Sequence, residues 1–378
     1  MPWKIYKKRH LTSFQVIILG FAGVILFGAL ILMLPISSVQ GIITPFHKAL
    51  FTSTSAVCVT GLAVVDTGSY WSAFGQTVIM FLIQIGGLGV ITTAVFILSG
   101  RKISIMQRST MQNAISAPKV GGIVQLMSFI LKGTLLIELI GALFMIPVFC
   151  HDFGLRGIWM SIFHSVSAFC NAGFDLLGTK WHPFVSLTSY AVNPVINIVI
   201  MLLIIIGGIG FFTWEDIYLH KFHFKHYHMQ SKVILTTTLC LILLPAVFFF
   251  FQDYGNLSGI HRLLASLFQA VTPRTAGFNT TDLSMLTGAS KAMMILLMLI
   301  GGSPSSTAGG MKTTTFAVIL LSVFASARGR KDCHVFGRRI ESDVLPSVLS
   351  IFIMYTALSS ISAVVVSHLE GIPMITAV

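Results

Sequence analysis

Seven apolar runs, each close to the length of a membrane-spanning helix, constrain this chain more than any other feature. They are Phe14–Leu34, Phe74–Leu98, Ile123–Phe149, Val195–Phe212, Val233–Phe251, Ala292–Phe324 with a break after Ile300, and Val344–Val366. A helix of about 20 residues crosses the roughly 30 Å hydrocarbon core of a bilayer. Only 10% of the residues are charged, against about 25% in soluble domains. The sequence therefore predicts an all-α, multi-pass integral protein of the cell membrane.

Basic residues mark one face of this predicted protein. They cluster before the first run and after the second, fourth and sixth: Lys4, Lys7, Lys8, Arg9; Arg101, Lys102, Arg108, Lys119; Lys221, Lys225, Lys232; Arg328, Arg330, Lys331, Arg338, Arg339. Loops rich in Lys and Arg stay in the cytoplasm, so residues 1–12 are expected inside. The first run is too long for a secretory signal and lacks an A-x-A site, so we interpret it as a retained helix. The net charge of +12 is confined to loops and does not indicate nucleic-acid binding.

The outer connections are too apolar to be simple loops. PFHKALFTSTSAV (45–57) has helical apolar spacing but is too short to cross the bilayer. Non-helical backbone at membrane depth is tolerated where it is buried in protein or lines an aqueous cavity. The predicted unit is helix, re-entrant pore helix with loop, and helix. It occurs in residues 13–100, 101–220 and 221–330, and residues 331–378 carry a cytoplasmic loop and the first helix of a fourth unit.

A glycine follows the short helix of each unit. Gly61, Gly173 and Gly277 lie 112 and 104 residues apart. Glycine reaches positive φ angles at little steric cost, and converging loops can replace an ion's hydration shell with backbone carbonyls. One such glycine would be read as an ordinary turn residue. Three at equivalent positions favour an ion-selectivity filter.

The motifs resemble a known family. TSTSAVCVTGLAVVDTG, HSVSAFCNAGF and VTPRTAGFNTTD, with QIGGLG, IIGGIGF and IGGSPSSTAGGMK in the second helices, are similar to the potassium-translocating subunit of the Trk/Ktr/HKT superfamily, closest to the bacterial Ktr type. The resemblance spans essentially the whole chain. It implies four helix-pore-helix repeats around one pathway, a homodimer, a cytoplasmic nucleotide-binding regulatory subunit, and potassium as the substrate with no cofactor in this chain.

The resemblance also assigns filter positions. These are Cys58, Val59, Thr60 and Gly61; Cys170, Asn171, Ala172 and Gly173; and Arg274, Thr275, Ala276 and Gly277. Within the family, Gly at the position of Gly61 accompanies potassium selectivity. A sodium-permeable or sodium-coupled cation transporter is the alternative.

Several ionisable residues lie near these motifs. Asp66, Asp175 and Asp282 follow the three glycines and would concentrate cations at the outer mouth, or else be ordinary loop acids. Arg274 should face protein and donate to carbonyls or a carboxylate behind the filter, as a structural strut. Glu138 lies at membrane depth, where it is a functional candidate or a hydrogen-bonded structural acid.

The sixth run carries a candidate gate. GGSPSSTAGGMK combines Gly, Pro and Ser in a way that interrupts a helix, and the family has a gating loop below the filter here. The gate residues are expected to be Gly301, Gly302, Ser303, Gly309, Gly310 and Lys312. A simple kink is the alternative.

Other site types fit the sequence less well. GGLGVIT and GGIGFFT do not complete G-x-G-x-x-G, and neither follows a strand. Four histidines in HKFHFKHYH (220–228) are explained by a basic loop more simply than by a metal site. The five cysteines form no C-x-x-C pair. No nucleophile–base or metal constellation lies inside the runs, so an enzyme is not expected, and a solute transporter would need polar midplane side chains.

The repeat spacing would place a fourth glycine beyond Val378. We therefore expect these 378 residues to be an inactive fragment that requires a fourth pore loop, supplied by a longer chain or by another one.

Overall fold

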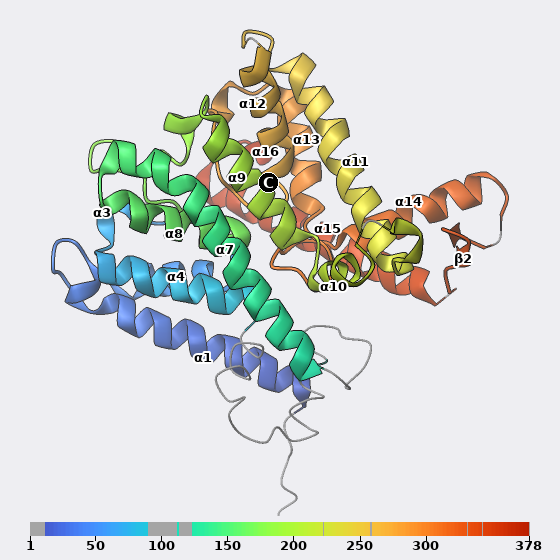
Figure 1. The fold of residues 1–378 in the computed structure, drawn as a ribbon, viewed down its shortest axis with the longest axis horizontal. Helices are drawn as coiled ribbons and strands as arrows, with labels where there is room; N and C mark the ends of the chain where they lie inside the picture. Colours follow the sequence, from blue (N-terminus) through green and yellow to red (C-terminus); the bar gives the residue numbers. More distant parts are fainter. Residues whose placement is uncertain are drawn as a thin grey trace, which may run out of the picture.

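Helices make up almost all the regular structure of this protein (Figure 1). The computed structural model describes residues 12–89, 112, 123–221, 223–257, 259–330, 332–341 and 343–377. Four helices in these residues are long and apolar enough to cross a membrane: α1 (Ser13–Met33), α7 (Ile123–Phe153), α11 (Met229–Gln252) and α15 (Val344–Glu370). Within the same ranges the only strands are β1 (His334–Val335) and β2 (Arg338–Arg339), a small antiparallel hairpin. The predicted all-α class is confirmed.

The first three long helices each begin the same succession of elements. A short pore helix follows, then a second apolar helix: α2 (Phe46–Val57) and α4 (Ala73–Leu88), α8 (Arg156–Phe169) and α9 (Pro194–Gly208), α12 (Gly259–Val271) and α13 (Gly288–Leu299). Smaller elements are α3 (Thr67–Tyr70), α10 (Phe211–His220), α14 (Thr313–Ala327), α16 (Met374–Ala377), and the 3-10 turns Pro35–Ser37, Thr188–Tyr190, Phe224–His226 and Leu283–Met285. The pore helices have 12 to 14 residues, so they are too short to cross a membrane.

Successive repeats pack through one recurring contact. The second helix of each repeat lies against the pore helix of the next, α4 on α8 and α9 on α12. After the break in the third repeat, α14 packs on α15. The second repeat therefore sits between the first, with α1 and α4 at the lower left of Figure 1, and the third, with α11 to α13 at the upper right.

A glycine–serine pair fixes each of the first two pore helices to its long helix. A Cβ on Gly28 would lie 2.5 Å from Ser53 Oγ, and one on Gly141 would lie 2.7 Å from Ser165 Oγ. The two serine hydroxyls donate to the carbonyls of Ile25 and Glu138, at 2.7 and 2.6 Å. Small residues let membrane helices approach closely, and hydroxyls then bond across the interface. The occurrence of this glycine–serine contact at equivalent positions of the first two repeats supports the repeat assignment.

The second helix of the second repeat is interrupted like that of the third, although the sequence predicted a break in the third repeat alone. α4 ends at Leu88 and Gly89 has φ +85°; the predicted extension over residues 90–98 lies outside the described residues. α9 ends at Gly208, and α10 departs at 97° after Gly210, whose φ is +89°. The predicted continuous span Val195–Phe212 is therefore wrong, because residue 210 takes left-handed angles that no helix continues.

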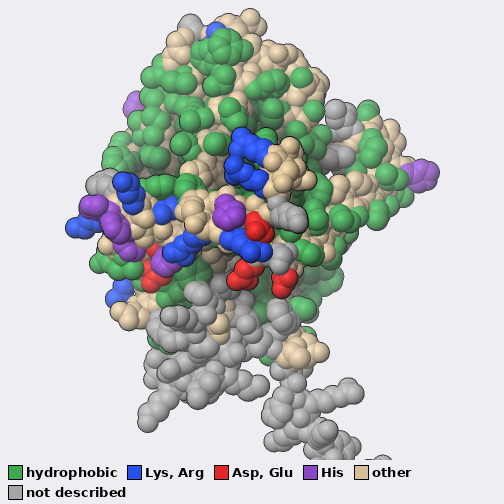
Figure 2. Space-filling model, turned by 90° about the vertical axis from the view of Figure 1, so that its right-hand side faces the viewer, with side chains coloured by type: hydrophobic (Ala, Val, Ile, Leu, Met, Phe, Trp, Pro, Cys, Tyr) green, Lys and Arg blue, Asp and Glu red, His purple; other side chains and the backbone are tan. Residues whose placement is uncertain are grey.

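Charged side chains gather on one part of the surface. Figure 2 shows Lys, Arg, His and acidic groups in a band below an extensive hydrophobic face. Lys221, Lys225, Arg328, Arg338 and Arg339, which come from the segments predicted to be cytoplasmic, are exposed. An apolar face bordered by a charged band is the pattern of a protein that sits in a bilayer.

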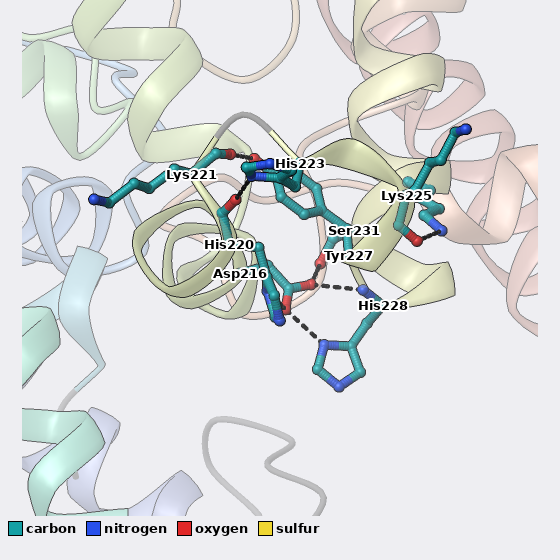
Figure 3. A network of polar contacts seen from close by, with 9 residues as sticks. Asp216, His220, Lys221, His223, Lys225, Tyr227, His228 and Ser231 are labelled. Carbon is teal, nitrogen blue, oxygen red and sulfur yellow. Dashed lines mark hydrogen bonds and ion pairs between the residues drawn. The ribbon is translucent and has the colours of Figure 1, made fainter.

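One buried carboxylate ties two repeats together at this charged band. Asp216 on α10 accepts from the backbone N–H of His228 at 3.0 Å, from the Ser231 hydroxyl, and pairs with His228 Nδ1 at 2.6 Å (Figure 3). It thereby satisfies donors at the first turn of α11, as a capping side chain does. Among the described residues no group of three or more His, Cys, Asp or Glu side chains could hold a metal ion. Two histidines of this segment, His220 and His228, instead lie 3.7 and 2.6 Å from Asp216 Oδ1.

Candidate ion pathway

Each candidate filter loop leaves the carboxyl end of a pore helix directly. α2 ends at Val57, α8 at Phe169 and α12 at Val271, and the predicted filter residues follow within three positions. A helix carries unpaired carbonyls and a partial negative charge at this end. Three such ends therefore direct electronegative groups toward the loops, which suits a cation.

The backbone of the three loops repeats one unusual conformation. Positive φ angles occur at Val59 and Gly61 (55° and 72°), at Asn171 and Gly173 (59° and 72°), and at Thr275 and Gly277 (72° and 81°). The intervening residue does not share them. Successive peptides that alternate between left- and right-handed angles turn like groups toward the same side of the chain. A row of carbonyl oxygens on one side can replace ion hydration.

This conformation is costly for the side chains present. A β-branched or bulky residue with positive φ is a genuine outlier, and such strain persists where the surrounding structure imposes it, often at functional sites. Val59 and Thr275 are both β-branched. A residue with positive φ precedes the glycine by two positions in all three loops, and it is strained in the two loops where it is β-branched, whereas Asn171 tolerates the angle.

The loops interlock in sequence order. A Cβ on Gly61 would lie 2.4 Å from the carbonyl oxygen of Ala172, and one on Gly173 would lie 2.3 Å from that of Ala276. Each glycine thus admits a carbonyl of the following loop, and no other residue type leaves that space. A Cβ on Gly277 would have no described atom nearer than 4.0 Å. The second loop is therefore packed on both sides, whereas Gly277 is exposed.

Hydroxyl groups hold the filter backbone from behind. Ser167 donates its hydroxyl to the Phe174 carbonyl at 2.7 Å, while its own carbonyl accepts from Ala172 N at 2.8 Å. Thr272 bonds Phe278 O in the same way at 2.6 Å. Both side chains are buried. Each spans its loop from one side of the glycine to the other, which fixes the carbonyl positions.

The first residue of each filter loop has different surroundings in the three repeats. Cys58 is exposed, and Cys170 is buried with its thiol 3.7 Å from Gln84 Oε1. Arg274 is buried, and its Nη2 donates to the Gly301 carbonyl at 3.4 Å. The expectation that Arg274 faces protein and bonds a carbonyl is confirmed. Its partner is the first residue of the predicted gate, which a one-dimensional pattern does not show.

The three predicted mouth acids are placed in different surroundings. Asp66 is buried and caps α3, accepting from Ser69 N at 2.8 Å, and it also accepts from Phe184 N of the second repeat at 2.9 Å. Asp175 accepts from Leu177 N at 3.1 Å, and burial raises its pKa to about 6. Asp282 is exposed, and hydrogen bonds from Ser284 lower its pKa. Asp66 is therefore a cross-repeat strut, whereas Asp282 is an open, ionised loop acid.

The predicted gate residues form a folded loop against the filter. Its ends are joined, because Gly301 N donates to Met311 O at 3.0 Å and Gly302 N to Gly309 O at 3.1 Å. Ser303 pairs with Thr313 through their hydroxyls at 3.0 Å. Lys312 folds back so that Nζ donates to Ala308 O at 2.8 Å. A Cβ on Gly310 would lie 3.5 Å from the Thr275 methyl group, so the loop touches a filter residue.

The loop also rests on the corner of the second repeat. Ser303 N donates to Gly208 O at 2.9 Å, and Phe211 N donates to Ser305 O at 2.7 Å. The break between α9 and α10 leaves these groups unpaired within their own helices. The loop of the third repeat supplies the missing partners.

The TrkH family, described as cation transport proteins, matches residues 6–376. The chain belongs to the TrkH family. Relatives of this TrkH-family chain include the Ktr system potassium uptake protein B of Bacillus subtilis, which is 41% identical over 95% of this chain and 82% of that protein. The potassium/sodium uptake protein NtpJ of Enterococcus hirae is 39% identical over 98% of this chain and 83% of that protein.

The fold comparison agrees with the sequence relatives. The crystal structure of the potassium transporter TrkH from Vibrio parahaemolyticus superposes with a TM-score of 0.73 at 19% identity, covering 98% of this chain and 75% of that one. The resemblance to the Trk/Ktr/HKT superfamily is thereby confirmed. The TrkH family is one of cation transporters, so the expectation of a transport protein agrees with the family.

Two buried polar links of this TrkH-family chain were missed from sequence. Gln84 on α4 donates to Glu138 on α7 at 3.3 Å, which supplies the partner that the sequence did not reveal. Thr307 of the loop contacts Asn171 of the filter. The residues of each pair lie 54 and 136 positions apart. The one sequence signal for these two links is that polar residues stand within apolar segments, where each needs a polar partner.

Proposed function

We propose that this protein takes up potassium ions across the cell membrane through the pathway lined by the filter loops Cys58–Gly61, Cys170–Gly173 and Arg274–Gly277. One observation carries the proposal. The three loops share an alternating backbone, and the carbonyls of Ala172 and Ala276 approach the glycine of the preceding loop. Convergent carbonyls that are fixed from behind suit a desolvated monovalent cation. The 41% identical relative named as a potassium uptake protein supports the choice of ion.

Further parts of the proposal concern assembly and orientation. The N-terminus is cytoplasmic, and the protein works as a homodimer with a cytoplasmic nucleotide-binding subunit. The basic segments on the charged band support this orientation through the positive-inside rule, and the relatives named as parts of a Ktr system support a partner subunit. The loop of residues 301–310 is the gate, since it touches the filter and closes on itself. A membrane potential of 100 mV contributes about 2.3 kcal/mol per charge, which drives accumulation without a cofactor.

Rubidium uptake tests the proposal directly. Cells without their own potassium uptake systems should accumulate rubidium and grow at low potassium when they express the protein together with its regulatory subunit and with the fourth pore loop that the repeat spacing predicts. Gly61→Ser should weaken discrimination against sodium about tenfold, because a side chain at φ +72° would project toward the Ala172 carbonyl. Unchanged preference for potassium in that variant would remove Gly61 from the filter.

A second candidate function is combined potassium and sodium uptake. The 39% identical relative is named a potassium/sodium uptake protein, and that similarity favours it. Equal saturation of uptake by the two ions would select this candidate over potassium-selective uptake.

A further inference from the structure

Thr307 joins the gate loop to the filter through its side chain. Its Oγ1 donates to the Phe169 carbonyl at 2.9 Å and accepts from Asn171 Nδ2 at 2.9 Å. The residue is 6% exposed. The hydroxyl has a single proton to donate, so both of its roles are filled by groups of the second repeat.

Asn171 depends on this contact for its orientation. Its amide nitrogen lies 2.9 Å from Thr307 Oγ1 and 3.3 Å from Phe169 O, while Oδ1 has no hydrogen-bond partner among the described residues. Asn171 is a filter residue with φ +59° and is 1% exposed. A buried amide that is held from one side only is fixed by the partners on that side.

The position of Thr307 is set by the corner of the second repeat. Its backbone N–H donates to Gly207 O at 3.2 Å. A Cβ on Gly207 would lie 2.0 Å from Phe169 O and 2.8 Å from Thr307 Oγ1. The pore helix, the loop and the broken helix therefore meet at one point, which a glycine keeps open.

The other two filter loops lack an equivalent link in the part of the chain that the structure describes. The residue that corresponds to Asn171 is Val59 in the first repeat, which has no polar side-chain atom. In the third repeat it is Thr275, whose Oγ1 is buried without a hydrogen-bond partner. Thr307 is therefore a gate side chain that holds a filter side chain at the second repeat, whereas the third filter loop contacts the gate through Arg274 and the backbone carbonyl of Gly301.

We propose that Thr307 is a specificity-determining positioning residue, which holds Asn171 in its left-handed conformation and so couples the gate loop to cation discrimination by the filter. This inference rests on the proposed function. A loop that moves away from the filter breaks both hydrogen bonds of the hydroxyl, and the second filter loop then loses its restraint. Gate position and selectivity change together.

Three variants test this coupling. Thr307→Val keeps the shape and removes the hydroxyl, Thr307→Ser keeps the hydroxyl, and Asn171→Gly removes the amide while tolerating positive φ. Inhibition of rubidium uptake by sodium is measured for each at matched protein levels in the membrane. The loss of two hydrogen bonds should reduce discrimination against sodium by roughly fivefold to tenfold in Thr307→Val, and Thr307→Ser should remain within about twofold of the unmodified protein. In the Asn171→Gly background, Thr307→Val should add no further change.

A binding measurement separates this inference from the proposed function. The midpoint of thermal unfolding of the purified protein is compared in KCl and NaCl, since a bound ion stabilises the folded state. The unmodified protein should be stabilised more by KCl, and Thr307→Val should lose that difference while Thr307→Ser retains it. Discrimination by Thr307→Val within twofold of the unmodified protein, or an effect that persists in the Asn171→Gly background, overturns this inference alone. Absence of both uptake and potassium stabilisation in the unmodified protein overturns the proposed function and this inference together.

Discussion

The second and third repeats both interrupt their second helix near a corresponding Gly-Gly pair, but the chain continues differently after the two breaks. After Gly207–Gly208 the chain turns a corner of 97° and begins α10 at once. After Gly301–Gly302 it forms a loop and resumes as α14 at Thr313. The carbonyls left free at the corner accept N–H groups of the loop at Ser303 and Thr307. The break in the second repeat therefore provides the acceptors, and the loop that forms at the break in the third repeat provides the donors.

The filter glycines show the same contrast. Gly173 is enclosed by the next loop, whereas no described atom lies nearer than 4.0 Å to a Cβ on Gly277, although both have positive φ. A shared motif therefore predicts the local backbone, and the neighbours decide what a substitution costs.

Gly173→Ser and Gly277→Ser give the largest expected effect. The added side chain at Gly173 would overlap the Ala276 carbonyl, which lies 2.3 Å from the position of its Cβ, so rubidium uptake should fall at least about a hundredfold. Against the described residues Gly277→Ser carries only the backbone strain, so it should lose less uptake than Gly173→Ser. Uptake at matched expression measures both. Equal losses would show that backbone strain alone governs the filter.

Excision of Ser303–Ala308 tests the loop as an obstruction. The ends of the loop are already joined between Gly301 and Met311, so α13 and α14 can be reconnected. We expect rubidium flux to rise roughly tenfold and to depend less on the regulatory subunit, because the segment that contacts the filter is gone. Discrimination against sodium should fall, since Thr307 is removed. A folded protein with equal or lower flux would contradict the assignment of a gate.

Gly207→Ala tests the close contact between the end of α9 and the pore helix α8, and two other glycines serve as matched controls. The methyl group would lie 2.0 Å from Phe169 O, whereas the nearest atom to a Cβ on Gly208 is 4.0 Å away and none lies within 4 Å at Gly309. Overpacking typically costs about 1–3 kcal/mol, so Gly207→Ala should lower the thermal unfolding midpoint. Gly208→Ala and Gly309→Ala should stay near the unmodified protein. If all three behave alike, the corner does not require close contact.

Asp66→Asn and Asp282→Asn give the smallest expected effect. Both carboxylate oxygens of Asp66 accept hydrogen bonds, one from Phe184 N and the other from Ser69. In the Asn variant an NH2 group replaces one of these oxygens, so one of the two hydrogen bonds is lost. The free energy of unfolding should fall by about 1–3 kcal/mol. Asp282 is exposed and caps a short turn, so its change should stay within about 0.5 kcal/mol. Chemical or thermal unfolding in detergent measures the difference, and a larger loss at Asp282 would reverse the comparison.

Much of the architecture was predictable because hydrophobic length and glycine spacing are local signals. The three pore helices, the positive φ at Gly61, Gly173 and Gly277, and the protein-facing Arg274 follow from composition, motif and the cost of charge in hydrocarbon. The end of α4 at Leu88 and the corner at Gly210 were missed, because a Gly-rich stretch inside an apolar run does not by itself show where a helix ends. Asp66 was predicted at the mouth and lies buried between repeats, since hydrogen-bond partners 118 residues away leave no local trace.

The sequence alone determined the membrane class and the repeated unit and predicted the residues of the proposed filter, because the bilayer demands long apolar helices and internally paired backbone, and a tight loop demands glycine. Tertiary structure decided which carbonyl each glycine admits, that the loop of one repeat completes the broken helix of another, and that Thr307 reaches Asn171. These depend on close approach between segments that are distant in the chain. Close approach is set by the packing of every helix at once, and no single stretch of residues encodes it.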